Sequence, residues 1–330
     1  MVNLILVLFL IGCTTGTTKT TTKDIDVRVG FAGLVMEFLK NTPPQKVFEG
    51  DVFPVIIKVR NTGAFSLKDN DKSILSLGIE KDYTKKVELL AGGKIEEVKE
   101  NAASFNLEGK SAINQKGEEE VISYNIQAGK VDPQSEAHPS TVIATLCYPY
   151  QTISESTVCI DTDISNIRPG KKVCKLQDIV FNNGQGAPVA VTKVEMQILP
   201  SQESQQSPQG YGIIVPQFLI YVENKGQGTV IRKESSNEFC TQSGTTHKNL
   251  NIVYVDAYLS NQKLKCQLEA TEGTSFPGHV KLKDKKDIIW CSNKEGIPAQ
   301  DTYLTPLKIV LSYGYTQSIS ANYFIQKTAR

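Results

Sequence analysis

The sequence repeats itself once, and this duplication limits the folds open to the chain more than any other feature. Residues 52–63 align with residues 215–226 at a constant offset of 163, and both segments end in the pattern Val-X-Asn-X-Gly. Residues 145–150 align with residues 310–315 at an offset of 165, and both carry a Tyr-X-Tyr pattern. Two signatures in the same order at nearly the same offset indicate a duplicated unit, and two copies are too few for a solenoid.

The length of the chain fits this duplication. At roughly 100 to 200 residues per domain, a chain of 330 residues makes two domains, each long enough to bury a core. Residues 166–170 include a Pro-Gly pair and are typical of a linker. We therefore predict tandem domains at 24–165 and 166–330.

Within each copy the apolar residues alternate as they do in half-buried strands. Phe53, Val55, Ile57 and Val59 recur at every second position, and residues 218–222 repeat the pattern. Gly, Pro, Asn and Asp clusters separate such runs, as turns between short strands require. The pattern predicts an all-β fold with two tandem immunoglobulin-like antiparallel β-sandwiches.

The repeat also predicts which residues take equivalent places. Val59 and Val222 should face the two cores, and so should Ile57 and Ile220, because side chains two residues apart lie on one face of a strand. The Gly of each Asn-X-Gly pattern should then end its strand in a turn with a positive φ.

The N-terminus predicts export and lipid anchoring. Residues 4–11 are an unbroken apolar run, long enough for a signal sequence but too short to span a bilayer. The run leads into Leu-Ile-Gly-Cys, a lipobox pattern, so residues 1–12 form the predicted signal peptide and Cys13 the lipidated N-terminus of the mature protein. The Thr-rich residues 13–23 would then be a tether. The alternative is a buried apolar strand with an incidental Cys.

These features predict a lipid-anchored protein on the extracellular face of the cytoplasmic membrane. The six remaining cysteines agree with an oxidising compartment, since they form an even set without a Cys-X-X-Cys pair. By proximity along the chain, we expect three disulfides that pair Cys147 with Cys159, Cys266 with Cys291, and Cys174 with Cys240.

The repeated strand and turn resemble a known family. The Val-X-Asn-X-Gly segments are similar to the core of CARDB-like domains, immunoglobulin-related adhesion modules of prokaryotic surface proteins. The wider pattern resembles uncharacterised archaeal secreted or lipid-anchored proteins, through residues 59–63, 222–226, 146–150, 158–161, 184–189 and 311–315. The resemblance implies a sandwich fold at the outer surface and marks no active site.

Common catalytic and cofactor motifs do not occur in the sequence. It contains no Gly-X-Ser-X-Gly, His-Glu-X-X-His or P-loop pattern. A net charge of +1 provides no field to attract nucleic acid. We therefore expect a non-enzymatic protein without a cofactor and without a nucleic-acid partner. A catalytic triad assembled from distant residues is the alternative left open, although the three histidines, His138, His247 and His279, are scattered along the sequence.

Two acidic clusters and two tyrosine pairs are the remaining candidates. Asp69 and Asp71, and Asp161 with Asp163, carry the oxygen ligands that calcium prefers, although acidic turn residues more often bond their own backbone. The Tyr-X-Tyr pairs at 148–150 and 313–315 favour a role in the core over an exposed platform for a partner.

The sequence therefore favours a surface interaction, adhesion or structural module. Its partners would be the membrane, through the lipid anchor, and an unidentified surface protein or glycan. A solute-binding lipoprotein is the first alternative, but it would need alternating helices that the pattern lacks. An enzyme-accessory lipoprotein is the second.

Overall fold

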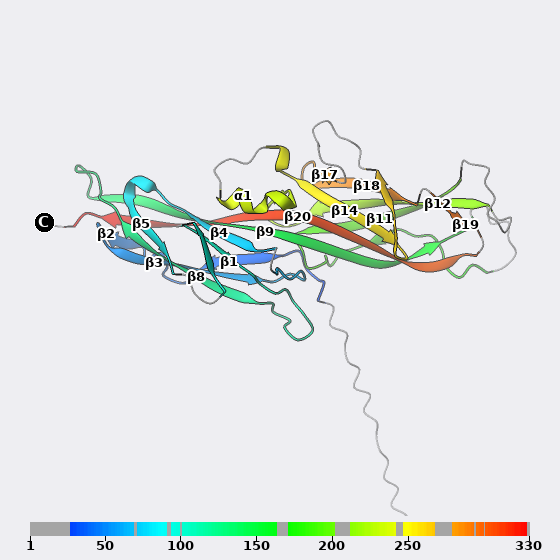
Figure 1. The fold of residues 1–330 in the computed structure, drawn as a ribbon, viewed down its shortest axis with the longest axis horizontal. Helices are drawn as coiled ribbons and strands as arrows, with labels where there is room; N and C mark the ends of the chain where they lie inside the picture. The colour runs from blue at the N-terminus through cyan, green and yellow to red at the C-terminus, as the bar shows by residue number, and fades with distance from the viewer. Residues whose placement is uncertain are drawn as a thin grey trace, which may run out of the picture.

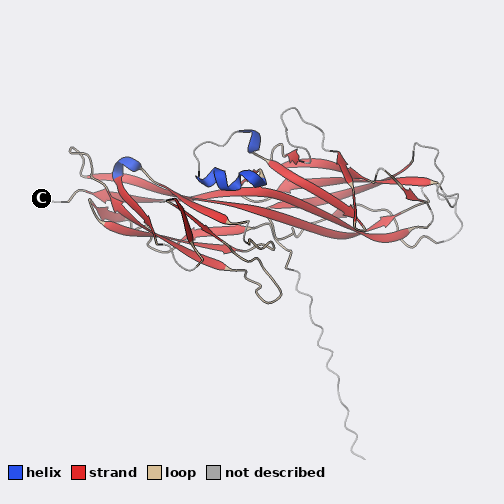
Figure 2. Cartoon of the chain, in the orientation of Figure 1, coloured by secondary structure: helices blue, strands red, loops and turns tan. Residues whose placement is uncertain are grey.

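The computed structural model describes residues 27–68, 71–90, 94–99, 101–163, 171–201, 212–241, 247–267, 279–293, 295–299 and 301–328. These residues form an elongated body made mostly of antiparallel strands (Figures 1 and 2). Their helical parts are short: α1 (Ser236–Thr241) and three 3-10 turns, η1 (Lys81–Tyr83), η2 (Lys233–Ser235) and η3 (His247–Asn249). The predicted all-β sandwich class is confirmed.

The first half contributes a four-stranded antiparallel sheet in the order β1-β3-β8-β5. Its strands are β1 (Leu34–Phe38), β3 (Val52–Asn61), β8 (Glu119–Ala128) and β5 (Thr84–Leu89). Buried and exposed residues alternate along β3, because every second side chain points into the core.

The second half builds a matching sheet. Its order is β10-β11-β12-β18-β16, with β19 (Ile297–Pro298) paired to β12. The other strands are β10 (Ile179–Val180), β11 (Val189–Pro200), β12 (Ile213–Asn224), β18 (Lys286–Ser292) and β16 (Lys265–Gln267). The strands β11-β12-β18-β16 thus repeat the order of β1-β3-β8-β5.

The repeated residues occupy equivalent places in these sheets. Ile57 lies opposite Ile122 across β3 and β8, and Ile220 lies opposite Ile289 across β12 and β18. Ile57, Ile220, Val59 and Val222 are all buried. The prediction that the duplicated segments form equivalent core strands is confirmed.

The third sheet runs through both halves. Its order is β15-β14-β20-β9-β4-β7-β6, and β13, β17 and β2 pair at its sides. Its strands are β2 (Lys46–Phe48), β4 (Ser73–Gly78), β6 (Glu96–Lys99), β7 (Ala102–Phe105), β9 (Ala137–Ile160), β13 (Thr229–Ile231), β14 (Ile252–Leu259), β15 (Gln262–Lys263), β17 (His279–Lys281) and β20 (Tyr303–Gln326).

Strands β9 and β20 form the spine of this shared sheet. Each has 24 residues, and they pair antiparallel along their whole length, as the long green and red strands in Figure 1 show. Pro149 lies opposite Gly314, which is its own repeat equivalent at the offset of 165. The two halves are therefore related by an approximate two-fold axis that passes through this pair.

The shared spine was not foreseen from the sequence, which suggested two sandwiches in succession. Residues 164–170, which contain the expected linker, lie outside the described residues, so the division at 165 and 166 stays a prediction. Buried side chains of both halves form one continuous core cluster. We therefore expect the halves to be energetically coupled.

All six later cysteines form disulfides, but two of the expected pairings are wrong. Cys147 is bonded to Cys240, and Cys159 to Cys174, while Cys266 is bonded to Cys291 as expected. Cys147 and Cys159 lie on the same continuous strand β9, so twelve residues of extended chain hold them roughly 40 Å apart. The polar segment between them does not turn the chain.

The Cys147–Cys240 bond fixes an insertion in the second half. Residues 225–251, between β12 and β14, include α1, whereas only residues 62–72 connect β3 to β4 in the first half. Helix α1 contacts β4 and β9 of the first half. The middle of the insertion is thus tied back across the two-fold axis.

The N-terminal predictions fall outside the described residues. The signal peptide at 1–12, the lipid site Cys13 and the tether at 13–23 therefore stay predictions. Among the residues that the structure describes, no helix is long and apolar enough to cross a membrane.

Candidate interaction surfaces

Four tyrosines gather at the two-fold axis. Tyr148 lies opposite Tyr315, and Tyr150 lies opposite Tyr313. Their rings pack against one another with centroid separations of 5.5 to 6.5 Å. At most 1% of each residue is exposed to solvent. The alternative of an exposed tyrosine platform is therefore wrong, and the predicted core role is confirmed.

Each Asn-X-Gly turn is held by a tyrosine hydroxyl. Asn61 accepts at Oδ1 from Tyr150 Oη (3.1 Å), and Asn224 accepts from Tyr315 Oη (3.2 Å). The same Asn oxygens accept from the Gly63 and Gly226 amides. The repeated pattern is thus a side-chain-closed turn, built twice with the same partners.

The glycines of these turns are needed for a different reason than expected. Gly63 and Gly226 are absent from the positive-φ residues of the described chain, so the predicted left-handed turn is wrong. A Cβ on Gly63 would collide with the Tyr150 hydroxyl, and one on Gly226 with the Tyr315 hydroxyl. Glycine is present because the hydroxyl occupies the space of a side chain.

Burial keeps the tyrosine centre neutral. It raises the pKa of Tyr150 and Tyr313 well above the usual range, and it raises the pKa of Tyr315 to about 12. The Tyr313 hydroxyl accepts from the Val189 amide at 3.3 Å. The Tyr148 hydroxyl lies beside the equivalent Leu34 amide without a hydrogen bond of normal geometry. These groups stabilise the fold and offer no accessible acid or base.

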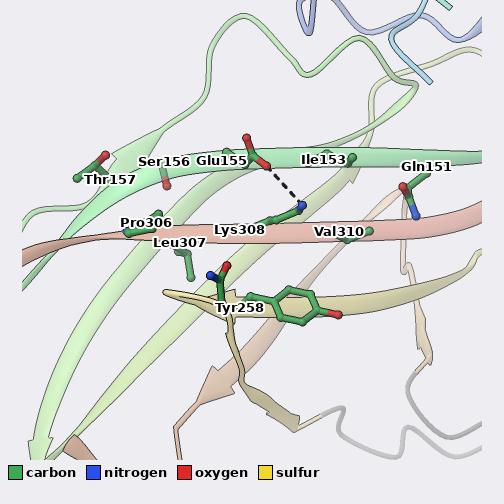
Figure 3. Close-up of a pocket in the computed structure, with 11 residues that line it drawn as sticks. Gln151, Ile153, Glu155, Ser156, Thr157, Tyr258, Pro306, Leu307, Lys308 and Val310 are labelled. Atoms are coloured by element: carbon green, nitrogen blue, oxygen red, sulfur yellow. Dashed lines mark ion pairs between the residues drawn. The ribbon is translucent and has the colours of Figure 1, made fainter. Parts of the chain in front are cut away.

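An open groove of about 730 Å³ lies on the outer face of the spine, where β9 and β20 run beside β14 of the second half. Its floor includes two successive pairs across β9 and β20, Ile153 with Val310 and Glu155 with Lys308, together with Gln151 of β9. Tyr258 of β14 borders the groove beside Lys308 (Figure 3). Strand alternation brings these side chains to one face.

The groove is amphipathic, and its charges are paired. Glu155 lies 3.6 Å from Lys308, and Figure 3 shows the two side chains pointing toward each other. Arg28 donates to the same carboxylate at 3.0 Å. Gln151 Nε2 donates to Ser312 Oγ at 3.2 Å. An apolar strip is therefore bordered by amide, hydroxyl and charged groups that can hydrogen-bond to a ligand.

The corresponding face of the first half is only partly covered. The two-fold axis relates Gln151 to Thr316 and Ser312 to Cys147, and Cys147 is bonded to α1. Thr145, Thr316 and Ser318, the equivalents of Val310, Gln151 and Ile153, line a second open groove of about 700 Å³ that Phe239 of α1 borders. Sequence analysis did not find these grooves, because their residues come from strands whose pairing the repeat alone does not specify.

One cluster combines the residue types of a triad, but its geometry is different. His138 Nε2 and Ser140 Oγ both contact Glu80 Oε2, at 2.9 and 3.2 Å. Ser140 Oγ also donates to Tyr323. The serine and histidine therefore share a carboxylate, whereas a nucleophile must bond to its base. His138, His247 and His279 lie on β9, η3 and β17, so the three histidines form no common site.

The calcium candidates are paired with lysines. Lys172 Nζ lies 2.6 Å from Asp161 Oδ2 and 2.7 Å from the Asp163 backbone oxygen, and Lys233 lies 3.0 Å from Asp71. Asp69 lies outside the described residues. Partial burial acts to raise the pKa of Asp161, but the hydrogen bonds from Lys172, the Asp163 amide and Thr302, with the charge of Lys172, together outweigh it and lower the pKa. A cation at Asp161 would have to displace an ammonium group.

The described part of the chain holds no group of three or more His, Cys, Asp or Glu residues arranged for a metal ion. The open groove is the candidate site that these residues offer.

No protein-family model matches this chain, and no curated protein matches it. Solved structures give distant similarities. A partial N-terminal region of the enterococcal surface protein is 9% identical with a TM-score of 0.20, covering 86% of this chain and 84% of that one. The collagen adhesin of S. aureus is 10% identical with a TM-score of 0.19, covering 92% and 93%.

The C-terminal domain of the Streptococcus agalactiae AgI/II polypeptide BspA is 10% identical with a TM-score of 0.18, covering 90% of this chain and 98% of that one. Similarity at this level carries no argument about function.

Proposed function

We propose that this chain is a non-enzymatic cell-surface lipoprotein that serves as an interaction, adhesion or structural module. The observation that carries the proposal is that all six described cysteines are disulfide-bonded. Such bonds persist in oxidising environments outside the cytosol. They support export, and with it the reading of residues 1–12 as a signal peptide and of Cys13 as the lipid site on the extracellular face of the membrane.

The shape of the body supports a scaffold role. Two paired strands of 24 residues each span roughly 80 Å, so the spine is long. The first described residues join it near the axis, where Gly30 donates to the Asn183 oxygen and accepts from the Gly186 amide. A lipid on Cys13 would therefore hold the body by its middle and leave both ends and the groove free for partners.

The side-chain chemistry supports a role in binding over one in catalysis. Within the described ranges, the open groove presents a carboxylate already bound by Lys308 and Arg28, and the Ser140 cluster has no nucleophile–base bond. We also propose that the two Asn-X-Gly turns place the chain near CARDB-like modules of archaeal surface proteins. Their matching tyrosine and amide bonds support a common strand-and-turn core.

Lipidation is the testable part of this proposal. In native membranes we expect a mature protein that starts at Cys13 and carries lipid, and a Cys13→Ser variant that leaves the membrane fraction. Intact-mass analysis measures the first result, and fractionation with surface biotinylation measures the second. A retained Met1, or an unmodified Cys13 thiol in membrane-derived protein, would contradict the lipoprotein assignment.

A further inference from the structure

The outer face of the second-half sheet carries an apolar platform at its centre. Leu219 lies opposite Trp290, and Tyr221 lies opposite Ile288, so four side chains form a two-by-two block on β12 and β18. Trp290 is 50% exposed and Ile288 is 44% exposed. Trp290 is the single tryptophan of the chain. We call these four residues the Trp290 platform.

A polar network borders the platform on the β11 side. Tyr221 Oη donates to Glu195 Oε1 at 2.8 Å, and Lys193 Nζ lies 2.7 Å from the same oxygen. Lys193 also bonds Asp178 at 2.9 Å and lies 5.8 Å from the centre of the Tyr221 ring. Fixed partners on the ring and hydroxyl hold Tyr221 in place before any ligand arrives.

The platform is a feature of the second copy alone. At the equivalent places of the first half, Ile56 lies opposite Ser123 and Lys58 lies opposite Val121. Lys58 is ion-paired with Glu37, as is usual for an exposed sheet face. The two copies share their core residues but differ here, because Ser123 and Lys58 correspond to Trp290 and Tyr221. Core packing does not require that difference, since these side chains point away from the core.

We propose that the Trp290 platform binds an uncharged oligosaccharide, an inference that rests on the proposed function and names its partner class. The C–H face of a pyranose ring is apolar, and its slightly positive hydrogens complement the negative face of the indole ring. Its hydroxyls need fixed donors and acceptors at the border, which Lys193 and Glu195 of β11 and Gln217 of β12 supply.

Other occupants fit the platform less well. A stable protein dimer buries about 20 to 30 residues a side, far more than this block of four. A peptide strand would add at a sheet edge, but β12 and β18 are interior strands of this sheet. A polyanion would need unpaired positive charge, and Lys193 is already neutralised by Glu195 and Asp178.

The lone tryptophan allows a direct test with the folded full-length protein. We would titrate it with hexasaccharides of β-1,4-glucose, β-1,4-N-acetylglucosamine and α-1,6-mannose. Saturable change in tryptophan emission with at least one of these sugars is expected. By calorimetry, Trp290→Ala should lower the affinity for that sugar at least about 10-fold, and Tyr221→Ala by several-fold.

The first half provides the matched control. Ser123→Ala, at the position equivalent to Trp290, should leave the affinity unchanged. Unchanged emission with all three sugars up to about 10 mM overturns the inference, because a dissociation constant above this concentration is too weak for a preformed binding site. Emission that changes with protein concentration, together with dimers in sedimentation, overturns it in favour of self-association. Neither result would affect the lipidation of Cys13, which tests the proposed function separately.

Discussion

Replacing Gly63 with Ala is expected to lower the free energy of unfolding by about 3–5 kcal/mol. The added Cβ would meet the Tyr150 hydroxyl and lie 2.7 Å from the Ala32 backbone oxygen. To avoid this clash, the tyrosine must break its hydrogen bond with Asn61, which leaves buried polar groups without partners next to the axis. Denaturant unfolding followed by far-UV circular dichroism measures the loss.

The duplication supplies a replicate and a control for this experiment. Gly226→Ala should cost a similar amount, because its Cβ would collide with Tyr315 in the same way. Gly78→Ala should change stability little, since its Cβ would find only ordinary contacts at 3.6 Å or more. Equal stability of the Gly63→Ala and Gly78→Ala variants would show that the tyrosine does not occupy the turn.

Removing the Cys147–Cys240 bond by a double Ser substitution should cost up to about 4–5 kcal/mol. The bond closes 93 residues of chain and thereby restricts the unfolded state strongly. Such a loss is a large part of the 5–15 kcal/mol typical of a folded domain. Because the halves share one sheet, we expect a single unfolding transition that shifts as a whole.

The matched control removes Cys159–Cys174, which closes only 15 residues and should cost less, about 3 kcal/mol. Peptide mapping under non-reducing conditions checks the connectivity itself. A peptide linking Cys147 to Cys159 would contradict the arrangement of β9 as one strand. A Cys147/Cys240 variant that unfolds in two separate steps would contradict the coupling of the halves.

The strands of each copy could be predicted because their signal is local. Alternation from Phe53 to Val59 specifies which side chains are buried whatever the partner strand is. The repeat then transferred that prediction to Ile220 and Val222, and both are buried. Local alternation is likewise what identified the sandwich class.

The pairing of strands could not be predicted in the same way. The Tyr-X-Tyr repeat identified 145–150 and 310–315 as equivalent, yet equivalence does not say that the two segments lie side by side. The expected bond between Cys147 and Cys159 is wrong for the same reason, because residues close in sequence are far apart along one extended strand. Gln151 and Glu155, which lie between them, are polar because they face the groove.

The surfaces were the hardest features to predict. Trp290 carries no motif, and its significance depends on Leu219, Tyr221 and Ile288, which pair with it or lie beside it only once β12 and β18 are in register. The groove depends in turn on the register of β9, β20 and β14. The platform and the groove both depend on the pairing of segments that are distant in sequence, whereas the sequence patterns reflect only residues that are close in sequence.

The measurement that tests the shared spine most directly is a nuclear Overhauser spectrum of the isotope-labelled protein. Directly opposed residues of antiparallel strands give a short backbone proton contact, either between α-protons or between amide protons. We expect such contacts at both ends of the spine, between Thr141 and Asn322 and between Glu155 and Lys308. Contacts at only one end, or none between β9 and β20, would contradict the two-fold body on which this account rests.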